Sequence, residues 1–459
     1  MRSGPDPFPQ VATLLDSVSP YGSRRLTVEC DGITSAAYLH DETTVIAATW
    51  LANHVRAPRT TDLTRLNAGQ APLMPASHTR HPRGRLPLDP AALQALWFEE
   101  GDGVALLERG TLLAVIPGWS DMSRGMPGYS RDVIGQTPFG WSLDDAMEGL
   151  GPRVERARQF WEWRDSAGGW GRFQQAVLSH LTSRLGPGAH YWNGAPGRRP
   201  SIGISERPPA PGRPYTVLST VGMSAQRMPV VEQVIDDPSG YSRIELAVAT
   251  TLPPGVAALV FLWLAGYPWR AVTWFGPGHS VRWYDKPSTF PLGGGHEAVL
   301  LLDDPSGLPG PPPPDLTGMH VDGDPVRWLW IIPISERSRL LAKERGSASL
   351  VTRLAAERRG WIVHPPRGAM GGGQGLWGRE PPCEKASPPC MKDCGAPVIT
   401  PLGVNVQVHA QQDQPPQQDR EDRAGQHAQP GQAEVTVVPG DETADDEVED
   451  YDEAAKPSS

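Results

Sequence analysis

The sequence predicts an α+β fold in two lobes, with mixed and antiparallel sheets, packed helices and a disordered acidic C-terminal tail. Apolar and polar residues alternate with a period of two in many short runs between residues 26 and 334, which is typical of strands. Two stretches in the middle of the chain have helical spacing instead. From about Arg367 the composition changes to Gly, Pro, Gln and acidic residues, which bury too little apolar surface to offset the entropy of ordering.

The charge of the chain is unevenly distributed. The 459 residues carry a net charge of −10. Residues 367–459 hold 17 acidic and 7 basic side chains, so residues 1–366, with 35 of each sign, are neutral. A neutral body lacks the excess of Lys and Arg that displaces counterions from nucleic-acid phosphates. We therefore expect no nucleic-acid partner.

Nothing in the sequence indicates a membrane protein. The most apolar run, residues 256–266, has eleven residues, whereas a membrane-spanning helix needs about 20. We expect it to be a buried helix or strand. The first ten residues, MRSGPDPFPQ, lack the apolar core of a signal peptide. The expectation is a soluble, cytoplasmic protein.

Residues 1–190 form the first predicted region. Its strands are expected at 26–30, 34–39, 44–51, 104–107 and 111–116, the last two joined as a hairpin. Its helices are expected at 11–18, 91–99, 153–165 and 170–185. Pro90 favours the second helix because proline is tolerated in a first turn, and Ser142 with Asp145 is a variant of the capping box. The last two helices should cover one face of the first sheet.

Residues 191–366 form the second predicted region. Strands are expected near Tyr191, Ile202, Val217, Leu246, Val281 and Val299 and at 327–334, followed by closing helices at 337–342 and 347–358. Ile244, Leu246 and Val248 alternate with smaller or charged residues, which predicts a strand with one face in a core. The run 327–334 is apolar at nearly every position and should be a central strand.

Four short motifs in this second region occur in a distinctive order. They are Ser219-Thr220-Val221-Gly222-Met223-Ser224, Arg243-Ile244-Glu245-Leu246, the apolar run from Trp330 through Pro333 and Ile334 to Glu336, and the helix Lys343 to Leu350. In this order and spacing they resemble the Suppressor of fused domain. The resemblance covers residues 192–366 and leaves the first 190 residues without an assigned family.

The resemblance implies a non-catalytic module that binds and sequesters another protein, with an extended peptide added along strands. Among bacterial relatives it also implies immunity proteins that neutralise toxins of polymorphic systems. We expect docking at exposed edges of the strands 215–221 and 243–248. The residues that match family motif positions, and so are candidates for partner binding or for maintaining the fold, are Thr220, Gly222, Met223, Ser224, Arg243, Glu245, Pro333, Ile334 and Glu336.

Two alternatives belong to other classes of function. One is an enzyme with a site between residues 1–190 and the Suppressor-like part, for which Glu99, Glu100 and His54 are the first suspects. Carboxylates of the run WFEEGDG, including Asp102, could act as an acid–base pair, although such a run is more often a solvated turn. The other alternative is that the acidic tail mimics an acidic ligand of a basic partner.

The sequence offers no convincing metal or cofactor site, and we expect neither. His40, His54, His78 and His81 lack the spacing of known ligand sets, and Cys383, Cys390 and Cys394 lack a fourth ligand. The glycine run 371–375 lacks the Lys-Ser/Thr of a phosphate loop. Most of the 16 Trp residues are expected in the core, and the rest would be candidate anchors at an interface.

Overall fold

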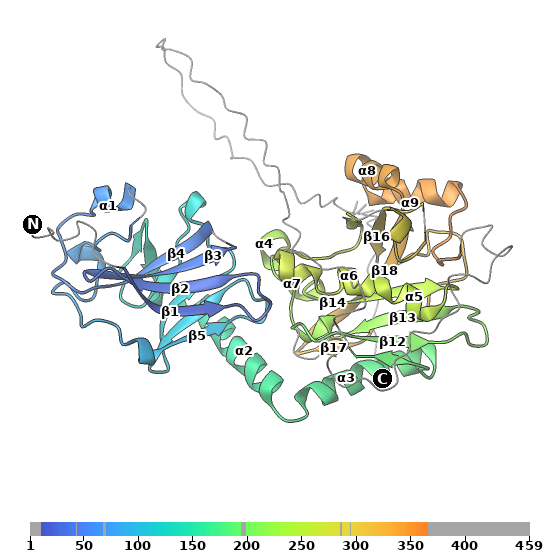
Figure 1. Ribbon diagram of the computed structural model, residues 1–459, viewed down its shortest axis with the longest axis horizontal. Helices are drawn as coiled ribbons and strands as arrows, with labels where there is room; N and C mark the ends of the chain where they lie inside the picture. Colours follow the sequence, from blue (N-terminus) through green and yellow to red (C-terminus); the bar gives the residue numbers. More distant parts are fainter. Residues whose placement is uncertain are drawn as a thin grey trace, which may run out of the picture. The chain divides into compact units, whose positions relative to one another are not determined.

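The computed structural model describes residues 11–42, 44–67, 70–193, 199–284, 287–293 and 295–365. The predicted tail, with its cysteines and glycine run, lies outside these ranges. Within them the chain has the expected α+β fold, with three sheets and helices packed on them (Figure 1).

Two sheets form the core of the first region. An antiparallel sheet has the order β1-β2-β3-β4, with strands Ala12–Val18, Arg25–Cys30, Thr34–Asp41 and Thr44–Asn53. A mixed sheet has the order β5-β6-β7-β8-β10-β9, with strands Leu93–Trp97, Val104–Glu108, Thr111–Ile116, Tyr129–Ser130, Gly140–Ser142 and Gln136–Thr137. Leu26, Val28 and Leu39 of the first sheet share a buried core with Leu106 and Leu113 of the second. The short helix α1 (Leu63–Asn67) belongs to the same region.

Three sequence expectations for this region are wrong. Residues 11–18 form strand β1 rather than a helix, and residues 93–97 form strand β5 after a single 3-10 turn at Pro90–Ala92. β1 pairs with β2 and β5 pairs with β6. This tertiary pairing outweighs the local helix preference of both runs. Ser142 caps no helix, because it lies in strand β10 and its N–H donates to the carbonyl of Gly135.

Two long helices follow. α2 (Met147–Asp165) packs Leu150, Val154 and Ala157 against β6 and β7 of the mixed sheet. α3 (Gly169–Leu185) does something different from what was expected. Its apolar stripe, Phe173, Val177, Leu181 and Leu185, lies in the core of the second region and not on the first sheet.

The second region is built on one eight-stranded mixed sheet. Its order is β11-β12-β13-β14-β18-β16-β15, with β17 paired to β18 (Figure 1). The strands are Tyr191–Trp192, Gly203–Arg207, Thr216–Val221, Arg243–Thr250, Asp324–Ile334, Ala298–Leu302, Ser280–Arg282 and, for β17, His320–Val321. β14 and β18 pair in parallel and lie in the middle, which confirms the prediction of a central strand at 327–334.

Each face of this sheet has its own core. One face carries α5 (Pro254–Ala257), α6 (Leu259–Leu264) and α7 (Tyr267–Ala271), so the apolar run 256–266 is helical and largely buried, with α4 (Val231–Val234) nearby. The other face carries α3, α8 (Glu336–Arg345) and α9 (Ser347–Ala356). β14 is buried at every position, because Ile244, Leu246 and Val248 face one core and Ala247 and Ala249 face the other.

In the part of the chain that the structure describes, no helix combines the length and the apolar character that crossing a membrane requires.

Candidate functional site

The first group of motif residues forms a closed cage around one buried carboxylate. Glu245 on β14 is fully buried, and its oxygens accept hydrogen bonds from the hydroxyls of Thr220 (2.6 Å) and Ser224 (2.7 Å). The backbone N–H groups of Gly222 (2.9 Å) and Ser224 (3.1 Å) donate as well, and that of Met223 is at 3.4 Å. Burial raises the pKa of Glu245, and these donors oppose the rise by stabilising the carboxylate.

Gly222 is required by the geometry of this cage. Its φ of +128° turns the chain from β13 into the 3-10 turn at Met223–Ala225, so that successive N–H groups point at Glu245. A Cβ at this position would meet the carbonyl oxygen of Ser201 and the ring of Trp170. The buried Ser224 hydroxyl donates a hydrogen bond to Glu245, and this contact gives it a structural role rather than that of a catalytic nucleophile.

Arg243 connects this cage to residues that the sequence did not link. Its side chain is 1% exposed. Its Nη1 donates to the carbonyl of Ser224 at 3.2 Å, its Nε to Asp324 Oδ2 at 3.0 Å and its Nη2 to Glu99 Oε2 at 3.1 Å. Arg227 completes the network with two hydrogen bonds to Asp324, at 2.7 and 2.8 Å. The network is a buried ion-pair cluster in which two guanidinium groups face two carboxylates.

Glu99 is therefore not in a solvated turn, and the expectation for WFEEGDG is wrong. Glu99 and Asp102 are buried. Burial raises the pKa of Glu99 and the charges of Arg243 and Arg227 oppose that rise. The hydroxyl of Tyr21 donates to the Glu99 carbonyl at 2.7 Å, and its ring packs 6.1 Å from that of Trp269. These contacts join residues of the first region to the second.

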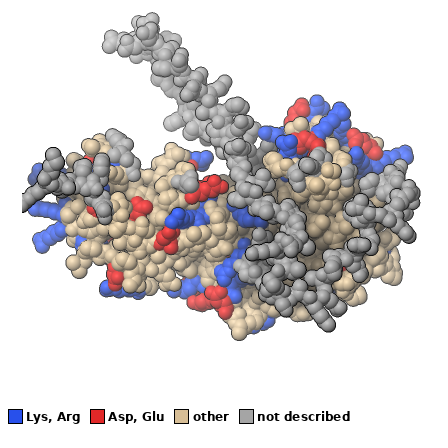
Figure 2. Space-filling view, viewed as in Figure 1, with Lys and Arg blue, Asp and Glu red and all other residues tan. Residues whose placement is uncertain are grey.

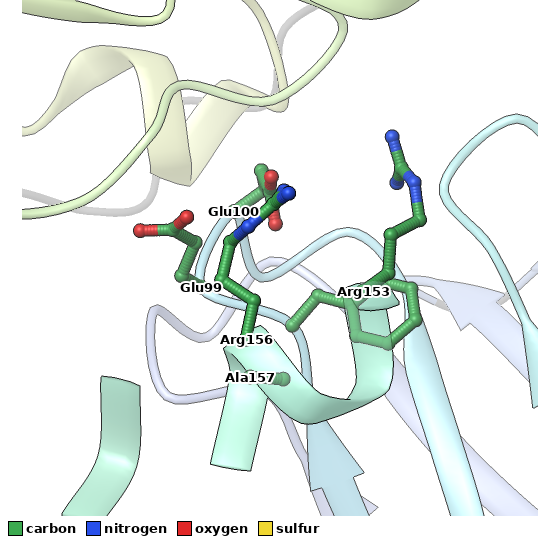
Figure 3. A pocket seen from close by; sticks show the side chains of 6 residues that line it. Glu99, Glu100, Arg153, Arg156 and Ala157 are labelled. Atoms are coloured by element: carbon green, nitrogen blue, oxygen red, sulfur yellow. The ribbon is translucent and has the colours of Figure 1, made fainter. Parts of the chain in front are cut away.

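A small hollow adjoins this network. It is lined by Phe98, Glu99, Glu100, Arg153, Arg156 and Ala157. The glutamates come from the loop after β5 and the arginines from α2 (Figure 3). It has room for about one water molecule. The carboxylate of Glu99 accepts hydrogen bonds from the Arg243 side chain and from the Arg227 backbone N–H. Glu99 is therefore part of the ion-pair cluster rather than a free acid or base.

The histidines are placed as structural residues. His54 Nε2 lies 2.7 Å from the Ser35 hydroxyl and its Nδ1 3.3 Å from the Arg85 carbonyl. His40 Nε2 lies 2.9 Å from the Thr27 hydroxyl, and His78 Nδ1 3.0 Å from the Ile134 carbonyl. Within the described ranges, no three His, Cys, Asp or Glu side chains converge as a metal-binding group.

The second group of motif residues lies at the end of β18. Pro333 pairs with Val299 on β16, and Ile334 is fully buried. Glu336 begins α8 and accepts two hydrogen bonds of 2.8 Å from Arg339. It also lies 3.7 Å from Arg282 on β15, so this motif position reaches the last strand of the sheet.

The expectation of exposed edges at 215–221 and 243–248 is wrong. β13 is paired on both sides, with β12 and β14, and β14 lies between β13 and β18. Both strands are buried at every position. In the described part of this sheet the outer strands are β11 and β15, each paired on one side along the strand order. These two strands, and the two-residue β17 that pairs only with β18, are the described strands of this sheet that have a partner on one side only.

Exposed apolar side chains lie on α6 and just past β15. Leu259 and Leu262 on α6 are 49% and 69% exposed, and Tyr284, just past β15, is 72% exposed. The rings of Trp263 and Trp283 meet edge to face at 5.0 Å, which ties α6 to the segment that follows β15. By contrast, many of the other Trp residues, such as Trp50, Trp269 and Trp361, are core residues. Charged side chains of both signs lie over the neighbouring helices α8 and α9 (Figure 2).

Sequence reasoning missed this edge and the partners of Arg243. In the run Ser280–Tyr284 only Val281 and Trp283 alternate with polar residues as in a strand. Nothing in this short run indicates that the strand lies at the edge of a sheet. The pairing of Arg243 with Glu99 joins residues 144 positions apart. The available signal was the WFEE run itself, because two acids directly after a buried apolar strand need a cationic partner unless they reach solvent.

Comparisons with solved structures give distant likenesses. A SUFU (suppressor of fused protein) homologue from Neisseria gonorrhoeae FA 1090 is 18% identical, with a TM-score of 0.30, and the match covers 42% of this chain and 93% of that one. A Sufu–Fu complex gives 16% identity and a TM-score of 0.31, with 42% and 89% covered. Drosophila Suppressor of Fused is 14% identical, with a TM-score of 0.26, and the match covers 36% of this chain and 41% of that one. No curated protein matches the chain.

The family comparison is specific to the second region. The model of the Suppressor of fused protein (SUFU) family matches residues 198–368, a range that contains every motif position described above. It begins after α3 and takes in the Glu245 cage, Arg243 and the last strands of the sheet. The chain thus carries a domain of the Suppressor of fused family over residues 198–368.

Proposed function

We propose that this protein is a non-catalytic module that binds and sequesters another protein. The observation that carries the proposal is the match of residues 198–368 to the Suppressor of fused family, a family of regulatory binding proteins. The chemistry of the motif residues agrees with this. Glu245, Ser224 and Arg243 use their polar atoms on one another and on the backbone, which supports the fold from within.

We propose the β15 edge as the place where the partner docks, by addition of an extended segment as a further strand. β15 pairs with β16 through residues 279, 281 and 283, as shown by the hydrogen bonds from Trp283 N to Glu297 O (2.7 Å) and from Leu301 N to His279 O (2.8 Å). The backbone groups of Ser280 and Arg282 therefore point away from β16. These groups supply affinity, and Leu259, Leu262 and Tyr284 supply apolar contacts for alternate side chains.

The experiment uses the full chain as bait and changes only the edge. Arg282→Pro removes the outward N–H of β15 and leaves the ladder to β16 intact, because proline is tolerated on the free side of an edge strand. Arg282→Ala is the matched control, since it loses the same side chain and its contact with Glu336 but keeps the N–H. Affinity purification from the native cells, with quantitative mass spectrometry, compares the three proteins.

A protein captured by the wild type and by Arg282→Ala, but reduced at least tenfold on Arg282→Pro, supports the proposal. Equal capture by all three baits places the partner elsewhere and overturns the β15 edge. If none of the folded baits retains a protein, the sequestering function itself fails.

We also propose, as the finer assignment, that the partner is a toxin of a polymorphic system, as implied by the resemblance to bacterial immunity proteins. The test is co-expression. The captured protein, expressed alone in a heterologous cell, should arrest growth, and co-expression of the wild type but not of Arg282→Pro should restore it. A harmless captured protein excludes the immunity role while leaving sequestration intact.

A further inference from the structure

We propose that residues 309–314 are a docking ligand for a protein module whose aromatic groove binds a polyproline II helix. The sequence of this segment is Pro-Gly-Pro-Pro-Pro-Pro, and it lies in the connection between β16 and β17. We call residues 308–316 the proline strap. The inference is independent of the β15 edge, because the strap is anchored on Trp361, whose ring packs against that of Trp330 on β18.

The backbone of the strap has the conformation that such a ligand needs. A proline ring holds φ at about −65°, and a residue that precedes a proline avoids the helical region. Pro311, Pro312 and Pro313 meet both conditions, so they are restricted to polyproline II and the neighbouring extended backbone. In agreement with this, residues 312–319 form no helix, strand or turn.

The strap is fixed on the protein at both ends and in the middle. Leu308 and Leu316, at its two ends, are each 4% exposed and lie in the core that contains α3. Between them, Trp361 Nε1 donates a hydrogen bond to the carbonyl of Pro311 at 3.0 Å. A Cβ on Gly310 would meet the indole of Trp361, so the chain passes directly over this ring. A ligand that is already held in its bound conformation loses little conformational entropy on docking.

The other side of the strap faces solvent. Residues 309–312 are exposed, and Pro313 and Pro314 are partly buried. A polyproline II helix has three residues per turn, so Pro312 and Asp315 lie on one ridge, and both are exposed. No other described residue donates a hydrogen bond to the carbonyls of residues 312–314. The exposed rings and these carbonyls are therefore open to a partner.

The chemistry of the strap favours an aromatic groove as the partner surface. Residues 311–314 have no backbone N–H, so they cannot donate to the ladder of a sheet. Residues 308–314 also have no charged side chain, so an ion pair cannot recognise them. They offer proline rings and carbonyl acceptors, which SH3 and WW domains bind in aromatic-lined grooves. The hydrogen bond from the Trp361 indole to Pro311 is a contact of the same kind within this chain.

A second proline-rich run in the same region has a different conformation and provides a control. Its sequence, at residues 208–214, is Pro-Pro-Ala-Pro-Gly-Arg-Pro. Ala210 and Arg213 exchange backbone hydrogen bonds of 2.9 and 2.8 Å, so the chain reverses direction between them. Pro211 is exposed but lies inside this turn, where it cannot belong to an extended polyproline II stretch.

The test is isothermal titration calorimetry of the full chain with two probes, a purified SH3 domain and a purified WW domain. Pro312→Ala removes an exposed ring of the strap. Pro211→Ala is the matched control, because it makes the same change at an exposed proline of the turn. For each probe, a variant with one aromatic residue of its groove replaced by Ala reports whether the groove is the binding surface. Thermal unfolding verifies that the variants of this chain are folded.

We expect at least one probe to bind the wild type and Pro211→Ala equally, and to bind Pro312→Ala at least tenfold more weakly. The groove variant of that probe should lose binding to the wild type. Absence of binding by both probes overturns the inference. Binding that Pro312→Ala leaves unchanged also overturns it, because other prolines of the chain would then be the ligand and the strap would only cover Trp361. Arg282→Pro should leave probe binding unchanged, so a failure of the β15 edge is distinguishable from a failure of the strap.

Discussion

Nη2 of Arg243 donates a hydrogen bond to Oε2 of Glu99 at 3.1 Å, although the two residues are 144 positions apart and belong to different regions of the chain. Both side chains are almost completely buried. Arg243 also holds Asp324 and the Ser224 carbonyl, so one guanidinium group ties the first region, β17–β18 and the Glu245 cage together. A family motif position is thus used here to anchor residues that lie outside the family match.

Arg243→Ala should destabilise the protein by about 3–5 kcal/mol, because it leaves the carboxylates of Glu99 and Asp324 buried with less compensation. Urea denaturation measures the change. Arg353→Ala is the control, since the pair of Arg353 with Glu357 is exposed and its loss should change the free energy of unfolding far less. Adding Glu99→Gln to Arg243→Ala should recover part of the loss. Strictly additive effects would show that the two residues do not interact.

Gly222→Ala should destabilise the protein by more than about 3 kcal/mol. The added Cβ would be strained at a φ of +128° and would also meet the backbone oxygen of Ser201. Gly212→Ala separates the two causes, because Gly212 also has a positive φ but open space where its Cβ would lie. That control should cost about 1–2 kcal/mol. Thermal unfolding compares them, and equal losses would remove the steric argument for the cage.

The Glu336–Arg339 pair predicts a loss of stability in acid. Hydrogen bonds from Arg339 hold the pKa of Glu336 below its ordinary value of 4.5, against the opposing effect of partial burial. Because the folded state binds this proton less readily than the unfolded state, the contribution is complete above about pH 4.5 and is lost as the pH falls through the folded pKa. Glu336→Gln should therefore be less stable than the wild type at pH 7, by up to about 1 kcal/mol.

Urea denaturation of both proteins between pH 3 and pH 7 should show this gap closing toward pH 3. A gap that stays constant over the range would mean that Glu336 acts through packing and not through its charge.

Leu262→Asp should reduce partner capture at least tenfold while changing the free energy of unfolding by less than about 0.5 kcal/mol, because Leu262 is 69% exposed. Leu86→Asp, at an 85% exposed leucine of the first region, is the control for an added surface charge. The measurement is quantitative co-purification beside urea denaturation. Loss of capture with both variants would point to a general charge effect.

Local pattern was enough to predict much of the second region. The apolar run at 327–334 indicated a central strand, and β18 lies between β14 and β16. Alternation failed where a strand is buried on both faces. In a half-exposed strand, Arg243 and Glu245 would face water. Here both side chains are buried, and partners remote in sequence compensate their charges or satisfy their hydrogen bonds. Pairings of that kind leave no periodic signal.

The errors in the first region have a different cause. Residues 93–97, Leu-Gln-Ala-Leu-Trp, are good helix formers and follow a proline that suits a first turn. They form β5 because β6 offers a ladder and Leu93 and Trp97 enter the shared core. Docking was placed on β13 and β14 for a related reason, since neither strand reveals in its own sequence how many neighbours it will have.

The range that matches the family model is shorter than the part of the chain that shares one core, because α3 precedes the match. The family match begins at residue 198, yet Val177 and Leu181 of α3 lie in the core with Val217 and Trp328, and His180 Nε2 lies 2.9 Å from the Leu316 carbonyl. A fragment trimmed to residues 198–368 would lack this helix and would expose the side chains that pack against it, including Val217 and Trp328. One face of the sheet in residues 198–368 is therefore completed by a helix that precedes the matched range, and a folded fragment of this part of the chain should begin before Gly169.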